Sequence, residues 1–295
     1  MAPGADTCVR VLPSHTDLPL KARALQVLDS ETFRCEYQPI VDVFSERVVA
    51  YEALARFELG GEEVAPNLVF GSLRSDPTLF FVLESKLKAF QLAHRPRGAR
   101  LFLNIDPLVC IEPYQVEHWT QLFRSRDDVV VEVVENIQAA TLQAVQSFIF
   151  ELAQLDVRCA LDDVGGPQTL FCFDLMEQCG YLKLDRRWFW RYHHDPAYRP
   201  LLKGLLDFAR ARGIGTVVEG VEEPEHLQIA RTLGVDQVQG YLFREHIVQA
   251  RSPAAEVQTA GARTPRPKRP GSEAPRPAPR SPSRSSLWDE ATLGG

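Results

Sequence analysis

The sequence predicts an α/β fold, a modified (β/α)8 barrel of the TIM type whose first pair of strands is antiparallel. From residue 36 onward, eight short apolar runs alternate with longer amphipathic stretches, the pattern of repeated β-α units. Eight strands of this kind favour a closed barrel over an open doubly wound sheet. The first two runs are separated only by Phe44-Ser45-Glu46, which is hairpin length and too short for a parallel crossover.

Each element follows from local hydrophobic spacing. A short amphipathic helix is expected over residues 18–28, before the first strand. Apolar residues at helical spacing predict further helices between the strands, including 141–155, which follows the capping candidate Thr141, and 199–212. The expected strands cover residues 36–42, 47–55, 101–104, 129–133, 158–162, 180–184, 215–219 and 236–240.

The chain is expected to divide into three parts. Residues 1–30 form an N-terminal extension with the short helix, residues 31–250 form the barrel domain, and residues 251–295 form a disordered basic tail rich in proline and arginine. The tail holds 8 of the 21 prolines and carries a net charge of +4, whereas residues 1–250 carry −10. That composition favours an extended segment. The N-terminal helix either packs against the outside of the barrel or docks a protein partner. The tail is a second candidate for docking a partner, and a solvated tail with no specific role is the alternative.

Charge, hydropathy and cysteine usage exclude several classes of protein. An acidic barrel is a poor non-specific binder of DNA or RNA. No apolar run reaches the roughly 18 residues of a transmembrane helix, and the N-terminus lacks the pattern of a secretory signal, so a cytoplasmic protein is expected. The six cysteines form no CxxC pair, which favours reduced, buried thiols over a metal knuckle or disulfide framework.

Polar residues interrupt or follow the expected strands at matching depths. A single residue of this kind is most simply a satisfied core polar group or a cap. Six strand ends that behave alike favour a shared site, because a barrel places the C-terminal ends of its parallel strands at one mouth. The residues are Asn104, Glu132, Asp162, Asp163, Lys183, Glu219 and Gln239.

A divalent metal explains why so many acidic groups would share one mouth. With Glu52, five carboxylates converge, and like charges that close cannot all stay ionised unless cations neutralise them. Oxygen ligands without histidine or cysteine select Mg²⁺ or Mn²⁺ over zinc. The tandem Asp162-Asp163 suits a bridge between two ions, which implies hydrolysis of a phosphodiester.

Eight motifs in order resemble the EAL-domain family, whose members are phosphodiesterases specific for the bacterial second messenger cyclic di-GMP. The resemblance covers about residues 33–247. It implies a barrel with one reversed strand, which is a feature of the family. The matching segments are Tyr37-Gln38-Pro39-Ile40-Val41, Tyr51 to Arg56, Asn104, Glu132-Val133-Val134-Glu135, Leu161-Asp162-Asp163-Val164-Gly165, Lys183-Leu184-Asp185, Glu219-Gly220-Val221-Glu222 and Gln239-Gly240-Tyr241.

The resemblance implies a role for each matching residue. Metal ligands, for two ions of Mg²⁺ or Mn²⁺, would be Glu52, Asn104, Glu132, Asp162, Asp163 and Glu219. Catalytic groups would be Glu52, Lys183 and Glu219, with Lys183 orienting water or phosphate as a cation. Substrate contacts would be Gln38, Arg56, Asp185, Glu222 and Gln239. Arg56 would hold phosphate, a surface salt bridge being the alternative reading. Glu135 would brace the loop after the paired aspartates.

One loop departs from the family pattern. Where the family has DDFGTGYSSL, this chain has the one-residue-shorter run from Asp162 to Leu170, and Pro167 removes an N–H donor there. In the family, this loop is associated with dimerisation and with the second metal, so a homodimer is left open.

The expected function is a metal-dependent phosphodiesterase that converts cyclic di-GMP to linear pGpG and lowers the level of the messenger. The alternative is a weakly active or inactive domain that acts as a cyclic di-GMP receptor or protein-interaction module.

Overall fold

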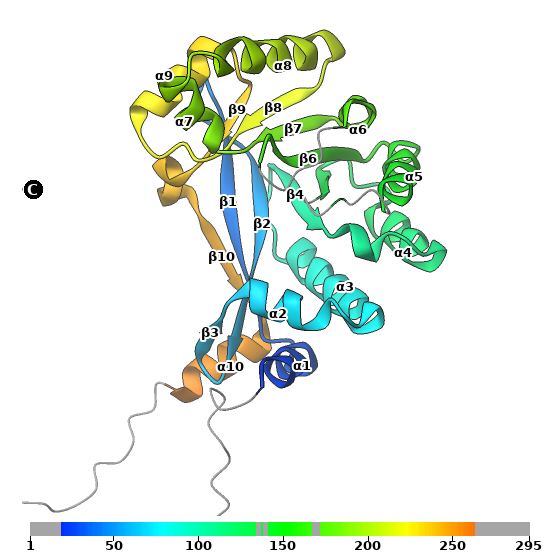
Figure 1. Cartoon of the computed structure of the whole chain (residues 1–295). Helices are drawn as coiled ribbons and strands as arrows, with labels where there is room; N and C mark the ends of the chain where they lie inside the picture. The colour runs from blue at the N-terminus through cyan, green and yellow to red at the C-terminus, as the bar shows by residue number, and fades with distance from the viewer. Residues whose placement is uncertain (1–18, 134–136, 138–140, 167–171, 263–295) are drawn as a thin grey trace, which may run out of the picture. The chain divides into compact units, whose positions relative to one another are not determined.

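The predicted barrel is confirmed. The computed structural model of the chain describes residues 19–133, 137, 141–166 and 172–262, apart from the side chains of residues 189, 190, 193 and 258–262. Eight strands close into a barrel with helices around it, and the first two strands form an antiparallel hairpin (Figure 1). The strands of the barrel are β1 (Phe33–Asp42), β2 (Val48–Leu59), β4 (Arg100–Ile105), β5 (Val129–Val133), β6 (Arg158–Val164), β7 (Tyr181–Leu184), β8 (Gly215–Val218) and β9 (Gln237–Gln239).

β1 is the reversed strand of the barrel. It pairs antiparallel with β2 on one side and with β9 on the other, and this second pairing closes the barrel. From β2 through β4 to β9, the remaining neighbours are parallel. The turn between β1 and β2 is held by the carboxylate of Asp42, which accepts hydrogen bonds from the backbone N of Ser45 at 2.8 Å and of Phe44 at 3.2 Å.

Helices cover the outside of the barrel and bury the larger of two apolar cores between themselves and the strands. Several begin with proline in the first turn, where a missing N–H removes no helical hydrogen bond. The helices are α1 (Leu20–Ser30), α2 (Pro66–Leu73), α3 (Pro77–Ala93), α4 (Pro113–Phe123), α5 (Leu142–Ala153), α6 (Phe173–Gln178), α7 (Arg187–His194), α8 (Tyr198–Arg212), α9 (Pro224–Leu233) and α10 (Pro253–Ala262), with 3₁₀ turns η2 (Pro107–Val109) and η3 (Tyr241–His246).

The β1–β2 hairpin reaches beyond the barrel. β2 pairs with β4 only over residues 50–52, and its far end at residues 57–59 pairs with the short strand β3 (Glu62–Val64). The beginning of β1, which lies beside this end of β2, pairs with β10 (Val248–Arg251) over residues 34–37. β3 and β10 were not among the predicted strands, and together with the hairpin they form an antiparallel extension (Figure 1).

The expectation of a disordered tail from residue 251 is wrong for its first part, because Arg251 ends β10 and residues 253–262 form α10. The hydroxyl of Ser252 explains where this helix begins. It accepts from the backbone N of Ala255 at 3.3 Å and donates to the carbonyl of Glu31 at 2.6 Å, so it caps α10 and ties it to the N-terminal segment. Residues 263–295 lie outside the described part of the chain.

The predicted N-terminal helix is present as α1, which buries Ala24, Val27 and Leu28. Among the residues described, no helix combines the length and the apolar character that a membrane span needs.

Candidate active site

The site stands directly above the inner core of the barrel. One side chain from each of seven strands fills that core: Ile40, Ala50, Phe102, Val130, Ala160, Tyr181 and Val217. Side chains alternate along a strand, so the residue two positions further on a parallel strand faces the interior one level higher. On the reversed strand β1, the same level is reached two positions earlier. This rule selects Gln38, Glu52, Asn104, Glu132, Asp162, Lys183 and Glu219.

Lys183 lies at the centre of these side chains. Its Nζ is 3.2 Å from Glu52 Oε2, 3.1 Å from Asp162 Oδ1 and 2.7 Å from Glu219 Oε1. It also forms an ion pair with Glu132. One cation therefore faces four carboxylates, and the cluster keeps an excess of negative charge if all of them are ionised.

Amide side chains orient Glu52 from both sides. Nδ2 of Asn104 donates to Glu52 Oε1 at 2.8 Å, and Nε2 of Gln239 donates to Glu52 Oε2 at 2.6 Å. Gln239 also donates to Oε1 of Gln38 at 3.1 Å, which links β9 to β1. The predicted residues on β1, β2, β4 and β9 are thus joined in one hydrogen-bonded network.

Burial shapes the charge of the site. Desolvation raises the pKa of Glu132 well above its usual range, with help from the nearby Glu52 carboxylate and against the pull of Lys183. Desolvation likewise raises the pKa of Glu219 to about 8. Burial alone would lower the pKa of Lys183, but the surrounding carboxylates, Asp162 first, raise it well above its usual value. Lys183 is therefore a permanent cation.

A bulge brings both aspartates of the tandem pair to the mouth. The register between β6 and β7 shifts between Leu161 and Val164, and Asp163 adopts a left-handed backbone conformation with φ of 51°. Aspartate tolerates this conformation better than most residues. Without the bulge, alternation would turn Asp163 away from Asp162.

The carboxylates form two groups, each suited to one cation. Glu52, Glu132 and Glu219 can each offer an oxygen such that all three atoms lie within 4.8 Å of one another, and the same holds for Asp162, Asp163 and Glu219. Glu219 is common to both groups. The Oε2 atom of Glu132 is fully buried and has no hydrogen-bond partner, which leaves it free to bind a cation. All-oxygen donor sets of this kind fit Mg²⁺ or Mn²⁺.

A hollow of about 370 Å³ opens above these residues. The structure brings seven of the predicted residues to its wall: Gln38, Glu52, Asp162, Asp163, Glu219, Glu222 and Gln239. Arg186 and Tyr241 also line it. Tyr241 ends the matched Gln239-Gly240-Tyr241 segment but was given no role from the sequence, and Arg186 was not singled out. The position of Arg186 next to the Lys183-Leu184-Asp185 segment is the signal that could have found it. We call this hollow the acidic hollow.

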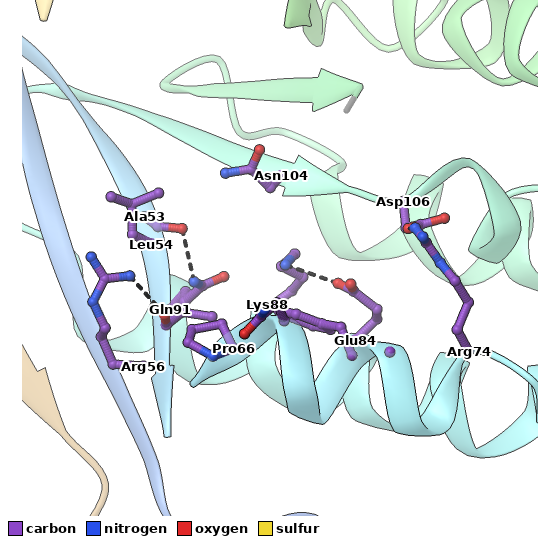
Figure 2. Close-up of a pocket in the computed structure, with 14 residues that line it drawn as sticks. Ala53, Leu54, Arg56, Pro66, Arg74, Glu84, Lys88, Gln91, Asn104 and Asp106 are labelled. Carbon is purple, nitrogen blue, oxygen red and sulfur yellow. Dashed lines mark hydrogen bonds and ion pairs between the residues drawn. The ribbon is translucent and has the colours of Figure 1, made fainter. Parts of the chain in front are cut away.

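Arg56 lines a second hollow of about 470 Å³, which it shares with Asn104, Lys88 and Gln91 (Figure 2). The two hollows share Leu54. The guanidinium of Arg56 donates to Glu36 Oε1 at 3.0 Å and to its neighbouring carbonyl of Ala55 at 2.9 Å. The structure therefore separates Arg56 from the acidic hollow and gives it an ion-pair partner.

One further predicted residue, Asp185, does not line the acidic hollow. Asp185 is buried just after β7, and its carboxylate accepts from the backbone N of Arg187 at 2.7 Å at the start of α7. Glu135, predicted to brace the altered loop, and Pro167 within that loop both lie outside the described residues. The roles of Arg56, Asp185 and Glu135 stay predictions.

Comparison with known proteins agrees with this geometry. The family model described as "EAL domain" matches residues 22–246. The chain is 26% identical over 230 residues to the probable cyclic di-GMP phosphodiesterase PdeN of Escherichia coli K12, covering 74% of this chain and 44% of that protein. It is 27% identical over 244 residues to the cyclic di-GMP phosphodiesterase RocR of Pseudomonas aeruginosa, covering 77% and 60%.

A solved structure shares the fold. The EAL domain of FimX from Xanthomonas citri, in complex with c-diGMP, superimposes with a TM-score of 0.62 at 21% identity, covering 75% of this chain and 91% of that one. The chain spans between about a third and three fifths of the length of the first curated relatives it matches. Because the family model matches most of the chain, with the ordered motifs at the mouth of the barrel, the protein belongs to the EAL domain family.

Proposed function

We propose that this protein is a metal-dependent phosphodiesterase that hydrolyses cyclic di-GMP to linear pGpG and so lowers the level of this messenger. The observation that carries the proposal is that two sets of three carboxylates have Glu219 in common, and that Glu219 forms an ion pair with Lys183. The names of the probable cyclic di-GMP phosphodiesterase PdeN and of the cyclic di-GMP phosphodiesterase RocR support the choice of substrate.

The residues that would hold two divalent ions are Glu52, Asn104, Glu132, Asp162, Asp163 and Glu219. When bound, such ions neutralise the carboxylates, lower the pKa of a water molecule and polarise the phosphate. Their identity as Mg²⁺ or Mn²⁺ follows from the oxygen-only donor set. Asn104 donates its amide hydrogen to Glu52, so its side-chain oxygen is the atom available to a cation.

Lys183 would act as a fixed positive charge. An ammonium with a raised pKa does not accept a proton near neutral pH, so its role is to orient the attacking water and to stabilise negative charge that develops on the phosphate. Four carboxylates hold it in place before the substrate arrives, which limits the reorganisation needed during the reaction.

The walls of the acidic hollow would bind the substrate. Gln38, Glu222 and Gln239 supply hydrogen-bonding groups there. Arg56 and Asp185 are proposed to contact the parts of the dinucleotide that extend beyond this hollow. A homodimer, and a protein partner that docks on the N-terminal helix or the basic tail, are further predictions that light scattering and pull-down with the full chain would test.

Turnover of cyclic di-GMP tests the proposal. The purified full chain is incubated with cyclic di-GMP and either Mg²⁺ or Mn²⁺, and the products are separated by chromatography. We expect pGpG with the wild type, none after addition of EDTA, and none with Glu52→Gln.

The matched control is Glu177→Gln, which makes the same change at an exposed position on α6 paired with Arg212. It should retain full activity. Absence of pGpG under both metals would refute the proposal, and tight binding measured by calorimetry in that case would identify a receptor instead.

A further inference from the structure

Trp188 connects the start of α7 to the bulge that carries Asp162 and Asp163. Its side chain is buried, and its Nε1 donates to the carbonyl of Val164 at 2.7 Å. Val164 directly follows the tandem aspartates at the end of β6, 24 positions before Trp188. The bond is therefore a tertiary contact at the place where the register between β6 and β7 shifts.

The indole ring also lies directly against the backbone of Gly165. A Cβ atom at Gly165 would lie 2.4 Å from Nε1 and 2.6 Å from Cε2 of Trp188, closer than real contacts allow. Gly165 has a φ of 84°, a conformation that favours glycine. The ring therefore occupies the space of the missing side chain and blocks movement of this backbone toward α7.

The bulge needs such support because its backbone conformation is unfavourable. Asp163 has a φ of 51°, and a non-glycine residue in this region persists only where the surrounding structure holds it. The backbone N of Gly166 donates to the carbonyl of Asp163 at 2.7 Å. The carbonyl of Val164 accepts from Trp188 Nε1 and from the backbone N of Asp185, the latter at 3.3 Å. Both of these donors follow β7, so they hold the bulge against the strand that carries the central lysine.

Trp188 is itself fixed in place. Its backbone N donates to the carbonyl of Asp185 at 3.0 Å, and the carboxylate of Asp185 accepts from the backbone N of Arg187 at 2.7 Å. Tyr198 of α8 packs edge-on against the indole, with ring centroids 6.3 Å apart. The indole is therefore a restrained brace between α7 and the bulge.

The two sets of carboxylates depend on the bulge to different extents. Asp162, Asp163 and Glu219, which we call the bulge set, take two of their three members from it, whereas Glu52, Glu132 and Glu219 take none. The affinity for a cation depends on how well the surrounding residues orient its ligands. A shift of the bulge should therefore weaken one cation site and leave the other nearly unchanged.

We infer that Trp188 is a positioning residue for the bulge set. Its indole N–H and ring hold the backbone so that the carboxylates of Asp162 and Asp163 both face Glu219. This inference rests on the proposed function, since the bulge set is taken to hold a divalent ion. Trp188 contacts neither the ion nor the substrate in this account, so it acts on the affinity for metal and not on KM for cyclic di-GMP.

Trp188→Phe tests the hydrogen bond, because it keeps an aromatic ring and removes the N–H donor. Mn²⁺ is titrated into the metal-free full chain, and the free ion is followed by electron paramagnetic resonance. We expect two sites in the wild type. In the variant, one site should lose affinity about 3- to 10-fold, the range expected for one hydrogen bond, and the other should keep its affinity.

Trp119→Phe is the matched control. Trp119 is also buried, and its Nε1 donates to the carbonyl of Val109 at 2.7 Å, which joins α4 to η2. The control removes the same kind of bond at the same distance, so its effect on the melting temperature should be similar. Both Mn²⁺ affinities should stay at their wild-type values, which separates positioning from general stability.

Turnover gives a second readout for Trp188→Phe. The Mn²⁺ concentration that gives half-maximal turnover of cyclic di-GMP should rise by the same factor as the dissociation constant of the weakened site. Saturating Mn²⁺ should restore kcat to within about twofold of the wild type, with KM for cyclic di-GMP unchanged.

Gly165→Ala tests the contact between ring and backbone from the opposite side. The added Cβ would collide with the indole, so we expect the same selective loss of Mn²⁺ affinity. Gly213→Ala is the control, because Gly213 has a similar φ of 67° and a Cβ there meets nothing within 4 Å. It introduces the backbone strain without the collision and should leave both affinities unchanged.

Wild-type Mn²⁺ affinities at both sites of Trp188→Phe and Gly165→Ala would overturn the inference and leave the proposed function standing. An equal loss at both sites would also overturn it, since that result indicates a general structural role. If the wild type binds two ions and the variants lose one selectively, but no pGpG forms, the positioning role stands and the proposed function fails. A wild type that binds no Mn²⁺ would overturn both.

Discussion

Lys183 and Glu132 form an ion pair that water does not reach: the side chain of Lys183 is 1% exposed and that of Glu132 is 0% exposed. Three more carboxylates surround the same ammonium group, so the pair is the core of a buried cluster with unequal numbers of positive and negative groups. Separate changes to the two residues should therefore have opposite effects on stability.

Lys183→Met should destabilise the metal-free protein and abolish turnover. Removal of one partner of a buried ion pair typically lowers the free energy of unfolding by about 3–5 kcal/mol, because the other charge is left without compensation. Chemical denaturation in EDTA measures this change. Lys203→Met, at a 72% exposed position on α8, is the control and should change stability by less than about 0.5 kcal/mol. A Lys183→Met protein as stable as the control would contradict the account of the cluster.

Glu132→Gln should increase the stability of the metal-free protein, because a carboxylate whose pKa is raised by burial is unfavourable in its charged form. Lys183 keeps three carboxylate partners in this variant. The same change should lower turnover of cyclic di-GMP at least about 100-fold, since a charge aimed at the reacting groups is lost. Denaturation and activity measured on one preparation test both effects. A decrease in stability would show that Glu132 is structurally required.

Removal of metal should make stability depend on pH. Burial raises the pKa of Glu132 well above its usual range and the pKa of Glu219 to about 8, so the folded metal-free protein binds more protons than the unfolded chain above pH 4.5. The contribution of these two groups to the free energy of unfolding should therefore be largest below pH 4.5. It should be lost as the pH rises toward 8.

Melting temperatures in EDTA and in Mg²⁺, compared at pH 5, 6.5 and 8, measure this effect. The stabilisation by Mg²⁺ should grow with pH, because the ion binds the ionised carboxylates and only the folded state arranges them. A difference between Mg²⁺ and EDTA that is constant or shrinks with rising pH would contradict the charge state described for the cluster.

Gly240→Ala should destabilise the protein by about 1–3 kcal/mol, as expected for an atom forced into a packed region. The added Cβ would lie 2.1 Å from the carbonyl oxygen and 2.3 Å from the backbone N of Val221, and neither atom can move like a flexible side chain. Gly204→Ala on α8 is the matched control, because a Cβ there meets nothing within 4 Å. It should stabilise the helix by about 0.5–1 kcal/mol. Equal thermal stability of the two variants would contradict the close packing at Gly240.

Much of the site could be predicted because strand alternation and barrel topology act together. Each buried run fixes which residue faces inward, and parallel strands then place those residues at one end. Asn104, Glu132 and Lys183 follow directly from this rule. The bulge at Asp162 and Asp163 does not follow from it, because the sequence predicted the pair of residues but not the register shift that turns both toward the mouth.

Arg56 shows where the linear pattern is insufficient. It has the same parity on β2 as Glu52, but four residues of extended strand span about 13 Å. β2 leaves the barrel after residue 52 and continues toward β3, which carries Arg56 to Glu36 and the second hollow.

The average composition of residues 251–295 did not predict α10, because it combines the helix with the proline-rich residues that follow it. The helix begins at the Ser252 cap and ends before the first proline-rich run.

The sequence by itself determined the barrel, the reversed first strand and the residue types at its mouth, because hydrophobic spacing and a three-residue connection admit few other folds. Only the tertiary structure decided which of those residues share a charge cluster and which line separate hollows. Distances between side chains on different strands depend on register, on bulges and on where a strand leaves the sheet, and these are set by packing across the whole barrel.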